Sequence, residues 1–408
     1  MKRVLILTAD SNTGYPVPAT KGGAVSELVE NLIVSNELEY TYNFEVISLF
    51  DQKAVDESLK FKNTRFHWVK TNFIIRFLDT LVFTLAKIVL RERSKSFKSM
   101  VMLLNYIRNA RRILKRNNYD HVIIENNMLL FWALKGLKKY QGKYYYHAHN
   151  LPRTNAFMNK TLLNTQKVLT VSDFVKNEIV DGDTKFPAIK KNKVEVLFNR
   201  IDLNHFKVLP NNCVSNLREK YNLKATQKVL LFAGRLSWEK GIDKIIDAIQ
   251  LLKDENIKLL IVGSVLHGSA RLEKDDYVNS LRKKIEQIGD KVVFTGYISY
   301  KDMPTIYNLA DIAILPSMWE EPAGLTPIEA MACGTPVITT NSGGIPEYVS
   351  DSAIVLNRDN NLAKNIATEI NKLIQDDNYY MEYKYRGLKR VLYYDSIEYA
   401  RVLKKTLI

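Results

Sequence analysis

The segment formed by residues 312–340 constrains the fold of this chain more than any other. It holds a short apolar run, Ile312–Leu315, then a polar loop, and a second apolar run at residues 336–340. Between the runs, Thr326 and Glu329 match a helix-starting capping box, in which Thr caps the helix and Glu reaches back to the cap amide. A strand, a helix and a second strand in this order predict an α/β sheet.

Two carboxylates of this segment lie where such sheets bind ligands. Glu321 is in the loop that follows the first strand, and Glu329 is in the first turn of the predicted helix. Ligands of open α/β sheets bind at the carboxyl ends of the strands, so both residues are candidate ligand contacts. Glu329 alone is equally compatible with a purely structural capping role.

Strands and helices alternate on both sides of a polar segment at residues 203–226. A chain of 408 residues is too long for one ordinary core. We therefore expect two doubly wound α/β domains that face each other across a cleft, with residues 1–205 in the first and 206–392 in the second. Strands are expected at residues 4–8, 45–50, 121–125, 143–148 and 168–172, and at 229–233, 258–263 and 292–295.

Two junctions between a strand and a helix carry groups suited to phosphate. Gly22 and Gly23 precede a predicted helix, where backbone amides and the helix N-terminus attract anions. Arg235 and Lys240 flank the turn into another helix. The arginine guanidinium offers several hydrogen-bond donors and the lysine ammonium a compact positive charge, and the two together suit a diphosphate. A glycine pair alone is a weak signal, and an isolated Arg or Lys is usually a surface charge.

Two histidines lie at the end of the expected strand 143–148. His147 and His149 would share a face on a continuous strand, but Asn150 and Pro152 predict that the strand ends there and that the two side chains diverge. A metal site would need further ligands, and none is evident from the sequence. A structural role is the alternative for both residues, and more so for His147.

The positive charge is concentrated in one stretch. The chain carries a net charge of +15. The stretch from Phe73 to Arg116 contains eleven basic residues and only two acidic ones. Apolar residues recur there at helical spacing, while charged residues interrupt any membrane span. We expect a basic amphipathic helix on an anionic membrane surface; the alternative is a core helix with a solvated basic face. The sequence contains no recognisable motif of nucleic-acid-binding proteins, so nucleic acid is not expected as a partner.

The cysteines and the N-terminus bear on the compartment. Cys213 and Cys333 are far apart in sequence and form no metal-like pattern, which favours a reducing environment. The apolar run at residues 4–9 is too short for the core of a signal peptide and indicates a first strand.

Several of these motifs resemble one family. Residues 320–338, EEPAGLTPIEAMACGTPVI, resemble the E-x(7)-E signature of the retaining nucleotide-sugar glycosyltransferases of family 4 (group 1), and residues 234–241 match its GR-x(4)-KG motif. The resemblance implies the GT-B fold, with an acceptor-side first domain, a donor-binding second domain, and a terminal helix at residues 393–408 that crosses back onto the first. Arg200 departs from the family pattern, because it stands where a glycine is usual, which puts the local turn in doubt.

The resemblance also implies roles for individual residues. Glu329 would hold the ribose and Glu321 the sugar hydroxyls, while His149 would contact the donor sugar or phosphate. The remaining donor contacts would come from the phosphate-binding residues Gly22, Gly23, Arg235 and Lys240, less firmly Lys21, and from the loop residues Pro322, Ala323, Gly324 and Leu325. No metal and no cofactor is implied.

The expected activity is retaining transfer of a sugar from a nucleotide-sugar, with UDP preferred, to a carbohydrate or lipid-linked acceptor. The expected setting is assembly of a bacterial surface polysaccharide or glycolipid, such as capsule or lipopolysaccharide, at the cytoplasmic face of the membrane. Three alternatives remain open: a nucleotide-sugar epimerase of the same fold, a glycogen-synthase-like glucosyltransferase, and a non-catalytic basic protein that binds membrane surfaces.

Overall fold

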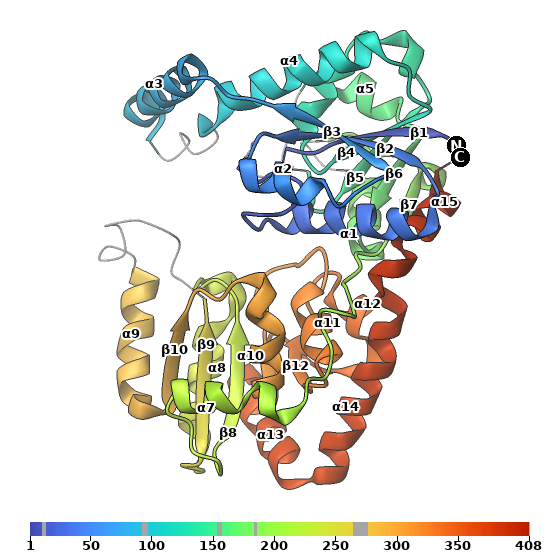
Figure 1. Cartoon of the computed structure of the whole chain (residues 1–408). Coiled ribbons are helices and arrows are strands. Elements are labelled where there is room, and N and C mark those ends of the chain that lie inside the picture. Colours follow the sequence, from blue (N-terminus) through green and yellow to red (C-terminus); the bar gives the residue numbers. More distant parts are fainter. Residues whose placement is uncertain (10–13, 92–96, 153–156, 183–185, 264–275, 408) are drawn as a thin grey trace. The chain divides into compact units, whose positions relative to one another are not determined.

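The chain folds into two compact units. The computed structural model describes residues 1–9, 14–91, 97–152, 157–182, 186–263 and 276–407. The first unit comprises Met1–Arg200 together with Ser396–Ile408, and the second comprises Ile201–Asp395 (Figure 1). The predicted segment 203–226 is therefore part of the second unit, and it contains the short helix α7 (Ser215–Lys220).

The first unit is built on a sheet of seven parallel strands in the order β3-β2-β1-β4-β5-β6-β7. Since all strands are parallel, their carboxyl ends meet at one edge. The strands are β1 (Arg3–Leu7), β2 (Asn43–Leu49), β3 (Thr64–Val69), β4 (His121–Glu125), β5 (Tyr144–Ala148), β6 (Lys167–Thr170) and β7 (Val194–Val196).

Helices cover both faces of this sheet. Figure 1 shows α1 (Ala24–Glu39) and α15 (Tyr399–Thr406) on one face and α4 (Met100–Arg116) on the other. The apolar residues of α4 recur every three or four positions and are buried, as expected for a helix that packs on a sheet. The other helices are α2 (Gln52–Ser58), α3 (Phe73–Leu90), α5 (Asn159–Leu163) and α6 (Asp173–Asp181).

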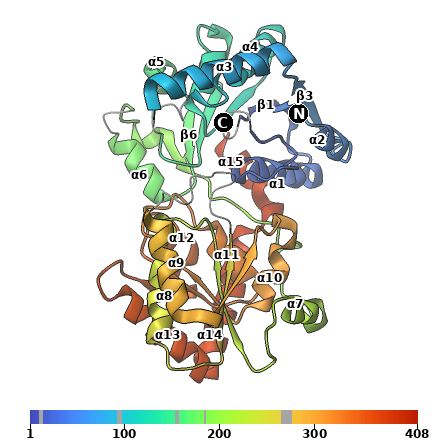
Figure 2. The same ribbon diagram turned by 90° about the vertical axis from the view of Figure 1, so that its left-hand side faces the viewer.

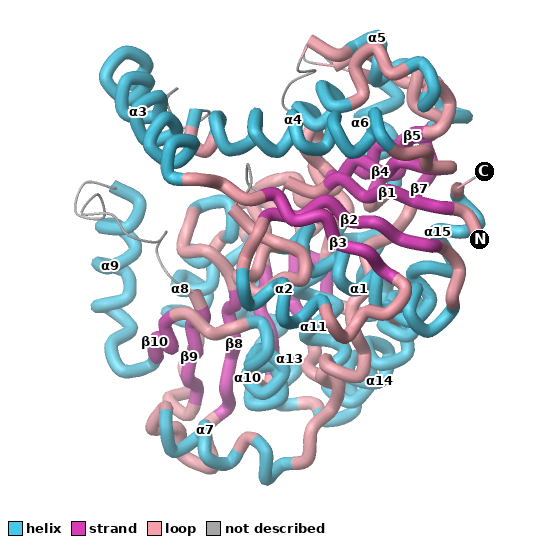
Figure 3. Tube along the Cα trace, turned by 45° about the horizontal axis from the view of Figure 1, so that its top comes forward, coloured by secondary structure: helices cyan, strands magenta, loops and turns pink. Residues whose placement is uncertain are grey.

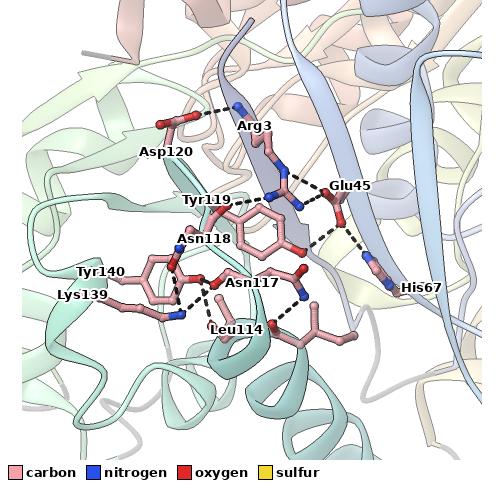
Figure 4. Close-up of polar contacts among 11 residues, drawn as sticks. Arg3, Glu45, His67, Leu114, Asn117, Asn118, Tyr119, Asp120, Lys139 and Tyr140 are labelled. Atoms are coloured by element: carbon pink, nitrogen blue, oxygen red, sulfur yellow. Dashed lines mark hydrogen bonds and ion pairs between the residues drawn. The ribbon is translucent and has the colours of Figure 1, made fainter.

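A polar cluster fixes the amino-terminal half of the same sheet (Figure 4). Glu45 of β2 accepts hydrogen bonds from the Arg3 side chain at 2.6 Å and from Tyr119 at 2.9 Å, and its other contact is His67 of β3 at 2.6 Å. Burial opposes ionisation of Glu45, but the hydrogen bonds from His67, Arg3 and Tyr119 outweigh it and lower the pKa of its carboxyl. This cluster ties three strands and the entry to β4 together, away from the carboxyl edge.

The second unit holds a sheet of six parallel strands in the order β10-β9-β8-β11-β12-β13. Together the two sheets confirm the predicted doubly wound α/β architecture. The strands are β8 (Lys228–Ala233), β9 (Ile257–Val262), β10 (Val292–Gly296), β11 (Ile312–Leu315), β12 (Val337–Thr340) and β13 (Ile354–Leu356).

Helices also cover both faces of the second sheet. One layer contains α8 (Ile242–Leu251), α9 (Asp276–Ile288) and α13 (Leu362–Gln375), whose apolar residues form a buried core with β8 and β9 (Figure 2). The opposite face carries α10 (Met303–Leu309) and α11 (Leu325–Ala332). Two further helices complete the unit, α12 (Ile345–Val349) and α14 (Asp377–Val391).

Two local expectations were wrong, and the doubt about the turn at Arg200 is settled. α11 begins at Leu325 with Gly324 at its N-cap and no side-chain cap, so Thr326 and Glu329 form no capping box. The tail is not one helix from residue 393: two short 3₁₀ turns precede α15. Arg200 needs no left-handed turn, because it is absent from the residues with positive φ, and it is 6% exposed.

The basic stretch forms two helices, α3 and α4, with residues 92–96 outside the described part of the chain. Most of the large apolar side chains of α3 are exposed, Ile75, Val82 and Phe83 are partly buried, and Ala86 is its one buried residue. Figures 1 and 3 both show α3 at the outer edge of the first unit, beyond its sheet. Among the described residues, no helix combines the length and the apolar character that crossing a bilayer requires.

Candidate functional site

A hollow at the carboxyl edge of the second sheet brings several predicted residues together. Lys240 ends the 3₁₀ turn that follows β8, and Glu321 lies in the loop after β11; Lys240 Nζ and Glu321 Oε1 are 2.5 Å apart. Ala323 and Leu325 line the same hollow, which has a cavity volume of about 50 Å³. A cation, a carboxylate and an apolar wall thus face one small space.

Buried hydroxyl groups hold the Glu321 loop against the sheet. Ser317 Oγ lies 3.0 Å from Glu321 Oε1. The Ser317 carbonyl oxygen accepts hydrogen bonds from the hydroxyls of Thr340 at 2.8 Å and Ser342 at 2.6 Å. Since all three hydroxyl residues are buried, the position of Glu321 depends on the end of β12 as well as on its own loop.

A glycine turn clamps the same loop from the other side. The Gly344 amide donates to the Glu321 carbonyl at 2.7 Å, and the Gly343 amide donates to Glu320 Oε2 at 2.5 Å. Gly343 has φ of 52°, and a Cβ at this position would lie 2.3 Å from the Glu321 carbonyl oxygen. Only glycine fits here, both for its backbone angle and for the close approach. Pro322 of the same loop is buried.

Glu329 occupies a different environment in α11. The Tyr307 hydroxyl donates a hydrogen bond to Glu329 Oε2 at 3.0 Å. The residue keeps some exposed surface, but protein surrounds its carboxyl group. This burial raises the pKa of Glu329 to about 7, although the hydrogen bond from Tyr307 acts in the opposite direction. The carboxyl group therefore changes charge close to neutral pH.

Arg235 is not part of this cluster. It follows β8 directly, is exposed, and is not among the residues that line the hollow. The structure thus joins Lys240 and Glu321, while Arg235 and Glu329 each lie apart from that pair.

The predicted phosphate loop of the first unit has the backbone that its glycines suggest. Gly22 and Gly23 have φ of 74° and 102°, and Gly23 is the N-cap of α1. Such angles favour glycine and leave the first amides of α1 without a side-chain cap. Lys21 instead forms an ion pair with Asp51, at 2.5 Å between Nζ and Oδ2.

The two histidines do not diverge, because both contact one carboxylate. Glu125 ends β4, beside His147 of β5. Glu125 Oε2 lies 3.0 Å from His147 Nδ1 and 2.8 Å from His149 Nε2, and the rings are 4.1 Å apart. The ligand atoms of these three buried residues lie within 4.8 Å of one another, so the structure supplies the further metal-type ligand that the sequence did not reveal.

Each histidine of this cluster places one ring nitrogen against the Glu125 carboxylate. Burial opposes ionisation of Glu125, but the charge and hydrogen bonds of His147 and His149 outweigh it and lower the pKa of Glu125 to about 2. Burial and the neighbouring His147 lower the pKa of His149. A neutral His149 that donates from Nε2 to this carboxylate keeps Nδ1 as an acceptor.

Sequence reasoning missed three residues that shape these sites. Ser317 contacts Glu321, Tyr307 contacts Glu329, and Glu125 contacts both histidines. For Glu125 a signal existed, since it is the last residue of a correctly predicted buried strand. Ser317 and Tyr307 carry no comparable local signal.

Two family models match the chain. Residues 214–390 match the model "Glycosyl transferases group 1", and residues 82–205 match "Glycosyltransferase Family 4". The first match covers the Lys240–Glu321 hollow and α11, and the second covers the Glu125–His147–His149 cluster.

Curated relatives and solved structures agree with these models. A putative glycosyltransferase, YtcC, of Bacillus subtilis is 26% identical over 82% of this chain and 74% of its own length. The lipopolysaccharide 1,2-N-acetylglucosaminetransferase of Salmonella typhimurium is 31% identical over 56% of this chain and 57% of its own length. The crystal structure of Anabaena HepE in complex with UDP and glucose is 20% identical, with a TM-score of 0.69 over 100% of this chain and 99% of that one. This last likeness extends the shared GT-B architecture to the whole chain.

Proposed function

Because this chain belongs to the group 1, family 4 glycosyltransferases, we propose that it transfers a sugar from a UDP-sugar, with retention of anomeric configuration, to a carbohydrate or lipid-linked acceptor. The observation that carries the proposal is the Lys240–Glu321 pair at 2.5 Å in the hollow of the second unit. The preference for UDP draws support from HepE, a structural neighbour solved with UDP and with UDP-glucose.

The chemistry of transfer matches this pair. Breaking the bond between the anomeric carbon and the diphosphate places negative charge on the leaving group, and a fixed cation that stabilises that charge lowers the barrier. Lys240 supplies such a cation, and Arg235 is free to add a second from the adjoining turn. Glu321 accepts hydrogen bonds from sugar hydroxyls, and Glu329 accepts them from the ribose.

Residues of the first unit complete the proposed set. The amides of Gly22 and Gly23 bind a phosphate oxygen at the start of α1. His149 contacts the donor through its ring. We propose that the reaction needs no metal, because protein cations serve the leaving group.

The setting we propose is assembly of a surface polysaccharide or glycolipid on the inner face of the cytoplasmic membrane. Relatives named for such roles include the Salmonella lipopolysaccharide enzyme and the Staphylococcus aureus capsular polysaccharide glycosyltransferase CapM, which is 30% identical over 55% of this chain. The exposed apolar face of α3 and the basic face of α4 suit contact with anionic lipid.

The proposed donor is tested by thermal shift across UDP-, GDP- and ADP-sugars, followed by a transfer assay with the sugar that stabilises most. We expect stabilisation by a UDP-sugar and transfer of its labelled sugar to an added acceptor fraction. A protein that interconverts the sugar without any acceptor is an epimerase, and one that binds no nucleotide-sugar is not the enzyme proposed.

Variants locate the active residues. Lys240→Ala should reduce turnover at least tenfold, or about 1.4 kcal/mol in the barrier. Lys284→Ala is the matched control, since it breaks a comparable ion pair, with Asp247 at 2.6 Å, on α9. Equal turnover in both variants would contradict the assignment.

Membrane contact has its own test. Neutralising the exposed residues Arg108, Arg112, Lys115 and Arg116 of α4 should reduce co-sedimentation with anionic vesicles while leaving the melting temperature unchanged. Arg111 stays intact, because it donates to the Ala133 and Lys135 carbonyls at 3.2 and 2.6 Å. Unchanged sedimentation would make this stretch a solvated basic face.

A further inference from the structure

Glu320, the residue directly before Glu321, has contacts of its own with two neighbouring loops. Its Oε2 accepts a hydrogen bond from the Gly343 amide at 2.5 Å, and its Oε1 pairs with the guanidinium of Arg358. Gly343 follows β12, and Arg358 follows β13. One carboxylate therefore joins the loops that end three adjacent strands of the second sheet, β11, β12 and β13.

The loop that carries Arg358 is itself well fixed. On one side of Arg358, the Asp359 carboxylate accepts a hydrogen bond from the Asn361 amide at 2.8 Å, just before α13 begins. On the other side, the Leu356 carbonyl accepts from the Asn341 amide at 2.8 Å, which ties the end of β13 to the end of β12. The guanidinium therefore extends from a backbone that is anchored on both sides, as a positioning group requires.

Glu321 needs support beyond its own contacts. Its carbonyl accepts from the Gly344 amide at 2.7 Å, and its carboxylate faces Ser317 and Lys240, the cation that a bound diphosphate would attract. When that cation turns to the ligand, the contacts of Glu320 remain and hold the loop in place. Since a shift of about 1 Å at an active site can reduce turnover about 100-fold, this support matters for catalysis.

A purely electrostatic role is the alternative for Arg358. Glu320 and Glu321 are adjacent carboxylates, and a negative charge close to a leaving diphosphate opposes its departure. Arg358 neutralises Glu320 in the same way as Lys240 neutralises Glu321. The two roles differ in one respect. Neutralisation by Arg358 matters only while Glu320 is present, whereas positioning of the loop needs both partners of the pair.

We propose that Glu320 and Arg358 are positioning residues, which together hold the Glu321 loop in its catalytic arrangement. This proposal rests on the proposed function, in which Glu321 contacts the donor sugar, and it places neither new residue against the substrate. The side chains of Glu320 and Arg358 are 47% and 26% exposed, so the pair contributes little to the overall stability of the fold. Loss of the pair should therefore change turnover far more than it changes the melting temperature.

A double-mutant cycle tests the pair. Glu320→Ala and Arg358→Ala should each lower turnover of the UDP-sugar about tenfold, and the double variant should be no slower than Glu320→Ala. Arg358→Lys should recover most of the turnover, because it keeps the charge that faces Glu320. Calorimetric affinity for UDP should stay within about twofold of the wild type in every variant, because UDP lacks the sugar that Glu321 contacts.

Arg386→Ala is the matched control. It breaks a comparable exposed ion pair of the second unit, with Glu382 at 2.6 Å, on α14. Its turnover should equal that of the wild type. The melting temperature should fall by no more than about 3 °C in the control and in the variants of the pair.

Several results would overturn this inference alone. Wild-type turnover in Arg358→Ala, losses that add in the double variant, or an equal loss in Arg386→Ala would each do so. A double variant that regains the turnover lost in Arg358→Ala would make Arg358 a neutralising charge. A loss of turnover that follows a lower melting temperature, or a lower affinity for UDP, would make the pair a structural one. Wild-type enzyme that neither binds nor turns over any nucleotide-sugar would instead overturn the proposed function itself.

Discussion

Glu329 combines an acidic side chain with an environment that keeps it partly protonated at neutral pH. Its pKa of about 7 follows from burial, and Tyr307 is its hydrogen-bond donor. A carboxylate accepts two ribose hydroxyls more strongly than a neutral acid does. We therefore expect the affinity for a nucleoside diphosphate to rise severalfold between pH 6 and pH 8.

Calorimetric titrations at several pH values check this expectation. Glu329→Gln should lose the rise, while Tyr307→Phe should shift its midpoint to higher pH, because the lost hydrogen bond stabilises the ionised carboxylate. Titration of the ligand's own phosphate affects all three proteins equally. The same rise in Glu329→Gln would refute the role in ribose binding.

Glu125 links its ionisation to the stability of the fold. Its pKa is about 2 in the folded protein and 4.5 for an ordinary glutamate, so it stabilises the folded state above pH 4.5 and loses this contribution as the pH falls toward 2. The difference corresponds to about 3 kcal/mol. Glu125→Gln should lower the free energy of unfolding by about that amount at pH 7. The difference in free energy of unfolding between the wild type and this variant, the stability gap, should disappear near pH 2.

Urea unfolding followed across this pH range measures the effect. Glu57→Gln is the control, because Glu57 is exposed and its pair with Lys60 at 3.2 Å lies on the surface, where such pairs contribute about 0.5 kcal/mol. A gap that does not change with pH would mean that Glu125 acts through packing and not through charge.

Candidate site residues were easier to find in the sequence than the contacts that position them. Glu321, Lys240 and His149 stand out in the sequence, but the contacts that position them come from Ser317 and Glu125, which the chain brings close only on folding. The expected capping box failed for the same reason. The Glu329 carboxylate was expected to accept a hydrogen bond from the nearby Thr326 amide, but it accepts one from the hydroxyl of Tyr307, which is 22 residues away in the sequence.

At the scale of elements, the loop from β11 to α11 depends on the turn that follows β12. Gly343→Ala would place a methyl group 2.3 Å from the Glu321 carbonyl oxygen, so the loop must move. We expect a loss of stability of more than about 2 kcal/mol and at least a tenfold loss of turnover.

Gly289→Ala provides a close control. Gly289 has φ of 53°, almost the same as Gly343, but nothing lies within 4 Å of its would-be Cβ. Gly289→Ala should lower the free energy of unfolding by only about 1 kcal/mol, because alanine is strained at a positive φ, and it should leave turnover unchanged. Thermal unfolding and turnover of both variants decide the point, and equal losses in both would show that the Glu321 loop is not clamped as described.

Strong periodicity predicted the buried elements well. Strands 121–125 and 312–315 have the expected bounds, since both are short apolar runs with clear ends. Short strands such as β7 and β13, with three residues each, lack such a pattern. For α3 the sequence left two outcomes open, a helix on a membrane surface or a core helix, because a helix with the same apolar spacing packs into a core when a partner covers it; the apolar side chains that the structure exposes agree with the first.

At the scale of the whole molecule, the repeated alternation of strands and helices was sufficient to predict two parallel sheets, and the structure confirms them. The family match adds the chemistry that alternation alone does not specify. The Lys240–Glu321 hollow supplies the site on which the proposed donor chemistry depends.

Removal of metal ions tests the proposed leaving-group chemistry. If protein cations stabilise the diphosphate, EDTA should leave turnover unchanged to within about twofold. This corresponds to a change of less than about 0.5 kcal/mol in the activation free energy. Loss of activity with EDTA, restored by Zn²⁺ in wild-type enzyme but not in His147→Asn, would instead place an ion at Glu125, His147 and His149.

Calorimetric titration of the wild-type protein and two variants with UDP tests the central claim most directly. The account predicts one UDP bound per chain, at least tenfold weaker binding to Lys240→Ala, and wild-type affinity in Lys284→Ala. UDP binding that is absent from the wild type, or as tight to Lys240→Ala as to the wild type, would contradict it.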